Sequence, residues 1–211
     1  MTAFITHCLK NARLDLIGLL ACACLVWGHT ESARAESPAT ELSLLRFERA
    51  GEAVLLTATI KFELPAAVED ALLKGVPMIF VAEADVFRER WYWTNKKVVS
   101  AERHMRLAYQ PLTRRWRLNV ASGLITNAAL GVALNQNFET LPDALAAVQR
   151  LSRWKIADVS EIDFEQRNLV DFRFRLDISQ LPRPFQIGTL GQADWNISVS
   201  SRQPLVLEGG K

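Results

Sequence analysis

The side chains that could perform catalysis are sparse in this sequence. His104 lies within a segment of strand-like alternation, and no G-x-S-x-G motif supplies a serine nucleophile, so a Ser-His-Asp triad is not predicted. Glu83 and Asp85, two positions apart on one predicted strand, could form the carboxylate pair of a glycoside hydrolase. We expect no catalytic residue, no metal site and no cofactor, and keep a carboxylate-based hydrolase as the alternative.

Arginine side chains are more informative, because they recur in a predicted three-stranded meander. Strands are expected over 78–93, 98–109 and 114–120, with turns at 94–96 and 110–113. Antiparallel neighbours joined in this way have a register set by their turns. The turns therefore predict which arginines share a face.

The register predicted from these turns gathers positive charge on one face of the meander. The second turn places Arg106 opposite Arg117, with Arg115 on the same face. The first turn places Arg88 opposite Glu102, and Arg90 lies nearby. Like charges directly opposite each other are destabilising, so this face needs compensation.

Two interpretations of the arginine face remain open. An anionic ligand or an acidic partner would compensate it, since guanidinium groups suit carboxylates and phosphates. Alternatively, the face is solvated and is balanced by Glu83, Asp85 or Glu89, if a bulge turns the first strand over. Such a bulge is suggested by the apolar residues of that strand, which move from even positions (Phe80, Val86) to odd ones (Phe87, Trp91, Trp93).

An aromatic triplet follows at the tip of the first hairpin. Trp91 and Trp93 alternate and are expected in the core, which leaves Tyr92 as the exposed residue. The candidate ligand- or partner-binding residues are Arg88, Arg90, Tyr92, Arg106, Arg115 and Arg117.

The remaining elements define the fold class. Period-two alternation predicts a hairpin of strands 42–49 and 54–64, a strand over 170–178 and a short strand over 195–199. Helical spacing predicts two short helices.
These span 66–74, after Pro65, and 141–151, after a capping Thr140. The expected fold is mainly β (α+β), an antiparallel β-sandwich-like meander with two short helices. Residues 119–136 are open between a short hairpin and a mobile loop.

The first 35 residues have the layout of a secretory signal peptide. Lys10 and Arg13 precede an apolar run over 16–27, and Ala33-Arg34-Ala35 forms an A-x-A cleavage site. An uncleaved N-terminal anchor, in the inner membrane, is the alternative. Cleavage would remove all three cysteines, Cys8, Cys22 and Cys24, and leave residues 36–211 as a single cysteine-free domain exported to the periplasm.

Composition agrees with a globular protein. Of 211 residues 49% are hydrophobic and 23% are charged, with a formal net charge of +2. So small a net charge gives no reason to expect nucleic acid as a partner. A membrane contact is expected only through the leader, if it is retained.

Several segments, in order, resemble the signature of the DUF4390 family of domains of unknown function. They include Leu72-Leu73-Lys74-Gly75-Val76-Pro77, Arg90-Trp91-Tyr92-Trp93, Leu107-Ala108-Tyr109-Gln110-Pro111-Leu112-Thr113 and Leu176-Asp177-Ile178-Ser179-Gln180-Leu181-Pro182. The resemblance runs from about residue 41 to 201 and implies an exported protein of the Gram-negative envelope. It transfers no catalytic residue, and it implies a role as accessory to an envelope sensing system.

These observations predict a non-catalytic periplasmic binding or adaptor module, with a protein or an anionic ligand of the envelope as its partner. The alternative is a carboxylate-based hydrolase acting on envelope polymers. A deep cleft with two carboxylates would favour the enzyme, and a shallow basic face would favour the adaptor.

Overall fold

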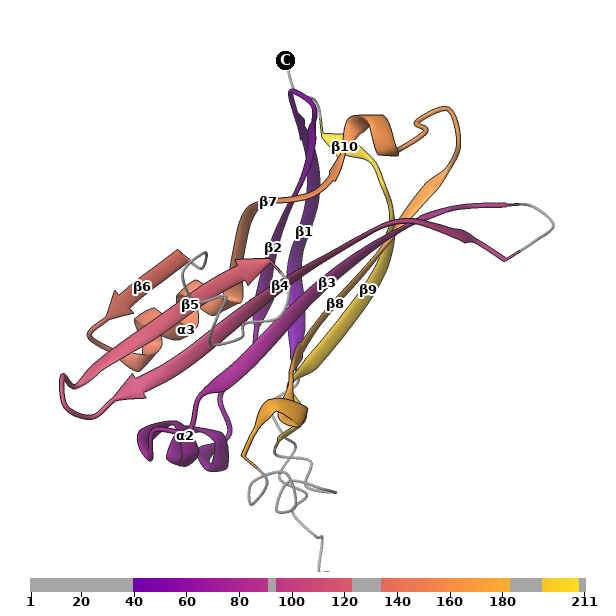
Figure 1. Ribbon diagram of the computed structural model, residues 1–211. Coiled ribbons are helices and arrows are strands. Elements are labelled where there is room, and N and C mark those ends of the chain that lie inside the picture. The colour runs from indigo at the N-terminus through magenta and orange to yellow at the C-terminus, as the bar shows by residue number, and fades with distance from the viewer. Residues whose placement is uncertain (1–39, 91–93, 123–133, 183–194, 209–211) are drawn as a thin grey trace, which may run out of the picture. The chain divides into compact units, whose positions relative to one another are not determined.

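A computed structural model describes residues 40–90, 94–122, 134–182 and 195–208. The predicted leader, the aromatic triplet Trp91, Tyr92 and Trp93, and residues 123–133 of the open segment lie outside the described residues. The described chain forms two β-sheets and two α-helices (Figure 1). The fold is mainly β with antiparallel sheets, as the sequence predicts.

The four-stranded sheet has the order β10-β1-β2-β7. Its strands are β1 (Glu41–Ala50), β2 (Ala53–Lys61), β7 (Arg150–Asp158) and β10 (Leu207–Glu208). The hairpin predicted between β1 and β2 is confirmed, and Gly51 in its turn has a φ of +60°, a conformation that suits glycine. β10 pairs with β1 in parallel, whereas the other pairs are antiparallel.

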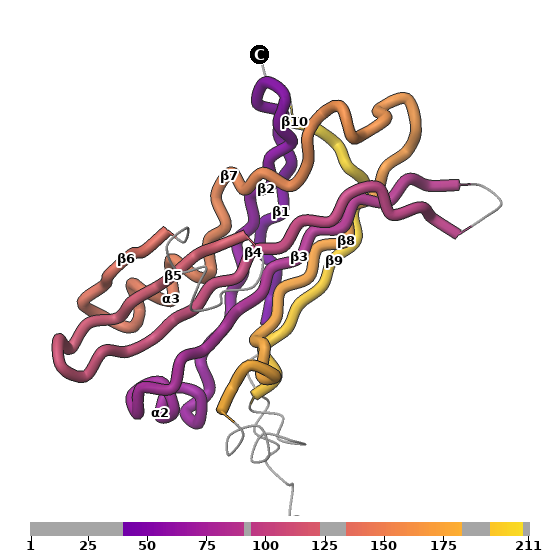
Figure 2. Tube along the Cα trace, viewed as in Figure 1, coloured from indigo at the N-terminus to yellow at the C-terminus, as the bar shows by residue number. Residues whose placement is uncertain are grey.

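The six-stranded sheet has the order β6-β5-β4-β3-β8-β9 and is antiparallel throughout. Its strands are β3 (Met78–Arg88), β4 (Lys96–Gln110), β5 (Arg115–Ser122), β6 (Leu134–Phe138), β8 (Asn168–Leu176) and β9 (Ser198–Pro204). The predicted meander is therefore confirmed as β3-β4-β5, and β3 runs beside β4 along the length of the sheet (Figure 2). The short strand predicted at 195–199 begins only at Ser198.

The helices are α2 (Ala66–Leu73) and α3 (Leu141–Gln149), and short 3₁₀ turns follow β7 and β8 at Val159–Glu161 and Ile178–Gln180. The Thr140 hydroxyl accepts a hydrogen bond from the Asp143 N–H at 3.3 Å, as the capping prediction requires. α3 ends two residues earlier than predicted, because Arg150 is already extended and opens β7. Among the described residues, no helix is long and apolar enough to span a membrane.

Both sheets contribute to one hydrophobic core, and β4 contacts β7 across them. The even-numbered residues of β3 from Met78 to Val86 are all buried there. The predicted change of face within β3 is therefore wrong. A register shift does occur at Val86/Phe87, but the additional residue, Val98, belongs to β4, and β3 pairs with β8 without interruption.

Candidate functional site

The predicted arginine face corresponds to the face of the six-stranded sheet that points away from the core. We call it the outer face. Odd residues of β3, such as Glu83 and Asp85, pair with even residues of β4 from Ser100 to Arg106 and lie on this face. Odd residues of β5 and β8 lie there as well. The outer face therefore carries polar and charged side chains on four adjacent strands.

The predicted pairing of β4 with β5 is wrong by one residue in each strand. Gln110 pairs with Arg115, and Arg106 faces Asn119 instead of Arg117. The turn occupies residues 111–114, and Arg114 adopts a positive φ of 52° within it. Because both strands shift together, the faces are preserved, and Arg106, Arg115 and Arg117 share the outer face as predicted.

The predicted pairing of β3 with β4 is wrong by an odd number of residues along most of its length. A shift of this kind moves side chains to the other face of the sheet. Glu102 faces Glu83 instead of Arg88, and Arg88 pairs with Lys96. Arg88 therefore lies on the same side of β3 as the core residue Val86, and its Nε is buried without a hydrogen-bond partner in the described part of the chain. Arg90 is exposed beyond the end of β3.

The candidate residues consequently do not form one cluster. β4 carries Lys96, opposite Arg88, near one end and Ala108, opposite Arg117, near the other. At the rise of an extended strand, the 12 residue steps from Lys96 to Ala108 span about 40 Å. Arg88 and Arg90 are thus at the opposite end of the sheet from Arg106, Arg115 and Arg117.

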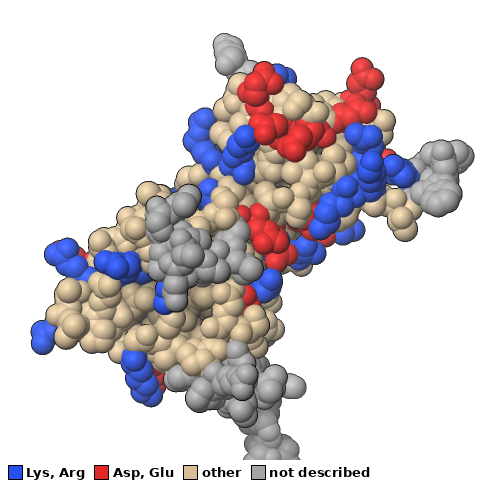
Figure 3. All heavy atoms as spheres, viewed as in Figure 1, with Lys and Arg blue, Asp and Glu red and all other residues tan. Residues whose placement is uncertain are grey.

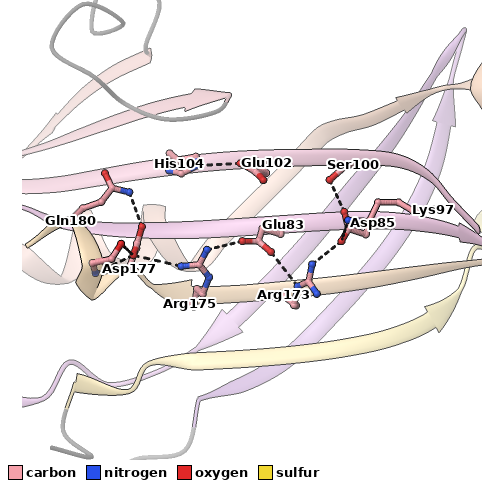
Figure 4. Close-up of polar contacts among 11 residues, drawn as sticks. Glu83, Asp85, Lys97, Ser100, Glu102, His104, Arg173, Arg175, Asp177 and Gln180 are labelled. Carbon is pink, nitrogen blue, oxygen red and sulfur yellow. Dashed lines mark hydrogen bonds and ion pairs between the residues drawn. The ribbon is translucent and has the colours of Figure 1, made fainter. Parts of the chain in front are cut away.

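The carboxylates of β3 are engaged by basic residues that the sequence analysis did not single out (Figure 4). The Arg173 guanidinium donates to Glu83 at 3.1 Å and to Asp85 at 2.7 Å, and Arg175 donates to Glu83 at 2.8 Å. Lys97 donates to Asp85 Oδ2 at 2.7 Å, the same oxygen that accepts from Arg173. Glu83 and Asp85 therefore do neutralise arginines on this face, but those arginines belong to β8 and not to the predicted set.

The Asp85 side chain is 2% exposed, which makes it the most deeply buried carboxylate of this cluster. Burial alone would raise the pKa of Asp85. Hydrogen bonds from Lys97 and Ser100, with the charges of Lys97 and Arg173, outweigh burial and hold that pKa below its usual value. A general acid needs the opposite shift, so Asp85 does not suit that role in glycoside hydrolysis.

The same network continues to the edge of the sheet. Arg202 on β9 donates to Asp171 on β8 at 2.7 Å, and Arg175 lies 3.6 Å from Asp177. Asp85 and Asp171 face each other directly, so each needs its own cation. We call this set the paired region: Glu83, Asp85, Asp171 and Asp177 with Lys97, Arg173, Arg175 and Arg202. The alternation of Asp171, Arg173, Arg175 and Asp177 in the sequence was the signal that could have revealed it.

His104 also lies on the outer face and is buried. Its Nε2 is 3.5 Å from a Glu102 oxygen, and neither ring nitrogen has a hydrogen-bond partner among the described residues. In the part of the chain that the structure describes, no cluster of three or more His, Cys, Asp or Glu side chains is placed to hold a metal ion.

The β4–β5 end of the outer face differs from the paired region. Its arginines are Arg106, Arg114, Arg115 and Arg117, a set that we call the basic end. Arg115 approaches Glu139 only to 3.9 Å, and Arg117 reaches Asn137 only at 3.5 Å. Arg106 and Arg114 make no side-chain hydrogen bond or ion pair within the described residues.

A large apolar side chain stands beside these arginines. Leu112, in the β4–β5 turn, is fully exposed at 101% of its reference area. In the space-filling view, basic side chains stand along the part of the molecule formed by β4, β5 and β6 (Figure 3). The basic end thus combines unneutralised guanidinium groups with an apolar tip.

Comparison with known proteins identifies the family of the chain. Residues 37–204 match the family described as Domain of unknown function (DUF4390), which covers nearly all of the described chain. The chain therefore belongs to this family. The comparisons with curated proteins and with solved structures gave no significant match.

Proposed function

We propose that this member of the DUF4390 family is a non-catalytic binding or adaptor module whose contact surface is the basic end. The observation that carries the proposal is the contrast on one face. The arginines of β8 and β9 are neutralised at 2.7–3.1 Å, whereas Arg106 and Arg114 have no such partner among the residues that the structure describes. Guanidinium groups that the fold does not use remain available for an outside anion.

The proposed partner is an acidic surface of another protein. Protein interfaces are enriched in arginine and place apolar side chains among polar ones. Leu112, in the turn that also contains Arg114, fits that composition. An acidic protein would pair with the arginines and cover the leucine, which a simple inorganic anion would leave exposed.

The proposed site of action is the bacterial periplasm, where the module would be accessory to an envelope sensing system. Support comes from the leader pattern over residues 1–35 and from the export that the family resemblance implies. N-terminal sequencing of the protein from cells should begin at Glu36. Recovery of intact Met1, or of a lipid-modified Cys22, would contradict export with cleavage.

Site-specific photocrosslinking tests the contact surface. A photoreactive amino acid in place of Leu112 should trap a defined protein in cells that express the chain. The same amino acid in place of Phe164, which is 42% exposed and precedes the strand that pairs with Arg88, should not trap it.

Charge reversal then tests the arginines. Arg106→Glu with Arg117→Glu should abolish the crosslink from position 112. The matched control is Arg49→Glu with Lys61→Glu, which makes the same change in net charge at exposed positions of the four-stranded sheet. An unchanged crosslink in the first variant, or an equal loss in the control, would refute the proposal.

A further inference from the structure

A cavity of about 440 Å³ lies on the core side of the sheet, near the end of α3. Its walls come from β4, β5 and β6 on one side and from α3 and the start of β7 on the other. Its lining includes Arg103, Met105, Leu118, Val120, Ala147 and Arg150. This volume is within the range of small-molecule sites in proteins, about 300–1,000 Å³.

The lining of the cavity combines apolar side chains with two positively charged ones. Met105, Leu118 and Val120 are core-facing residues of β4 and β5 and form the apolar part. Arg103 and Arg150 bring two guanidinium groups, and no acidic side chain is among its described lining residues. Among these described residues, the two guanidinium groups of the cavity therefore have no acidic counterpart.

Arg103 is the more enclosed of the two arginines. Its guanidinium lies over the Trp154 ring, 5.2 Å from the ring centroid, and makes no ion pair within the described residues. Burial lowers its pKa, yet an arginine side chain remains charged at neutral pH. A half-buried cation of this kind is incompletely solvated, so a bound anion would restore the interactions that water no longer provides.

We propose that this cavity binds a small anionic amphiphile. Its head group would contact Arg103 and Arg150, and its apolar chain would lie against Met105, Leu118 and Val120. The shared chemistry is a carboxylate or phosphate attached to an apolar chain. Neither an acyl chain alone nor a bare anion would use both halves of the lining.

The amphiphile site is separate from the basic end. Arg103 and Met105 are odd residues of β4, and Arg106 is even, so the two sites lie on opposite faces of the same strand. The proposed partner contact and the proposed amphiphile binding can therefore succeed or fail independently.

Isothermal titration calorimetry with the intact protein tests the site. Decanoate and decyl phosphate, each below its micelle concentration, should bind with a stoichiometry of one, and acetate should bind at least tenfold more weakly. The tighter of the two long-chain anions identifies the preferred head group. Absence of saturable binding by both, or acetate binding as tight as decanoate, would overturn the proposal.

Variants identify the residues that hold the ligand. Arg103→Gln and Arg150→Gln should each weaken binding of the tighter anion by about tenfold or more, the loss expected for a hydrogen bond to a charged group. Arg117→Gln, the control with the same charge change on the outer face, should leave binding within about twofold. Equal weakening by all three would indicate non-specific attraction and refute the site.

Because Arg103 also packs on Trp154, its variant could fold poorly. Arg150 is exposed and makes no described ion pair, so Arg150→Gln tests the head-group contact without that complication. Ala147→Leu reduces the cavity from the helix side, and it should weaken the long-chain anions but not acetate. Unchanged binding in both variants would contradict the proposal.

Discussion

Two regions of one sheet face both contain arginine side chains, but these differ in how closely acidic groups approach them. In the paired region, Arg173 is held by Glu83 and Asp85 at 3.1 and 2.7 Å. At the basic end, the one partner of Arg117 among the described residues is the Asn137 amide oxygen at 3.5 Å. Both regions include part of β4, so the difference arises from the side chains of the neighbouring strands. In the paired region, β3 and β8 supply carboxylates.

The comparison separates arginines that stabilise the fold from arginines that are free to recognise a partner. A cation between two carboxylates contributes through Coulombic attraction and hydrogen bonds, and removing either partner leaves the other uncompensated. An exposed cation without a partner contributes little to the free energy of unfolding. Stability and binding measurements should therefore respond to different arginines.

The largest effect should come from Asp85→Ala. The substitution leaves Lys97 and Arg173 without the carboxylate that joins them, and it also removes the acceptor of the Ser100 hydroxyl. We expect a loss of about 2–3 kcal/mol in the free energy of unfolding, less than the 3–5 kcal/mol of a fully buried pair, because both cations are half exposed. Urea denaturation measures it.

Glu139→Ala is the counterpart at the basic end and should change the free energy of unfolding by less than about 0.5 kcal/mol. Glu139 is 83% exposed and lies 3.9 Å from Arg115. Equal losses for Asp85→Ala and Glu139→Ala would show that the two regions do not differ.

Acid should weaken the paired region specifically. Hydrogen bonds and nearby cations hold the pKa values of Asp85 and Asp177 below their usual 3.8 in spite of burial. A depressed folded-state pKa contributes stability above the unfolded-state value, and that stability is lost as the pH falls below about 3.8. The urea midpoint, followed from about pH 6 to about pH 3, should fall, and Asp177→Asn should flatten the decline. A midpoint independent of pH would contradict this.

A double-mutant cycle should detect coupling only in the paired region. Arg173→Ala and Asp85→Ala should interact by about 1–2 kcal/mol, because the two side chains are in direct contact. The cycle of Arg117→Ala with Asn137→Ala should give a coupling near zero. Coupling of similar size in both cycles would break the proposed distinction.

Within the paired region, the edge of the sheet should show the smallest effect on stability. Asp171 has one ion-pair partner among the described residues, Arg202, which is 57% exposed. Asp171→Ala should therefore cost only about 0.5–1 kcal/mol in the free energy of unfolding. A loss as large as that of Asp85→Ala would mean that burial is not what distinguishes the two carboxylates.

Local patterns in the sequence predicted the strands and faces that depend on alternation alone. The positions of Arg106, Arg115 and Arg117 on one face survive the error in the β4–β5 turn, because a shift of one residue in both strands preserves faces. The start of α3 was predictable because Thr140 and Asp143 cap it locally.

Pairing between distant segments was not predictable in this way. Glu83 and Arg173 meet because β3 lies beside β8, and no turn connects the two strands. Arg88 was placed on the wrong face, since the additional residue in β4 at Val98 leaves no clear mark in the alternation. The side-chain partners on neighbouring strands could therefore be identified only from the three-dimensional structure.

The variant Arg106→Glu with Arg117→Glu, measured for both unfolding and crosslinking from position 112, tests the central claim most directly. We expect a free energy of unfolding within about 1 kcal/mol of that of the wild type, because each surface substitution costs at most about 0.5 kcal/mol. The crosslinked partner should be lost. An unfolding loss comparable to that of Asp85→Ala, or a crosslink that persists, would contradict it.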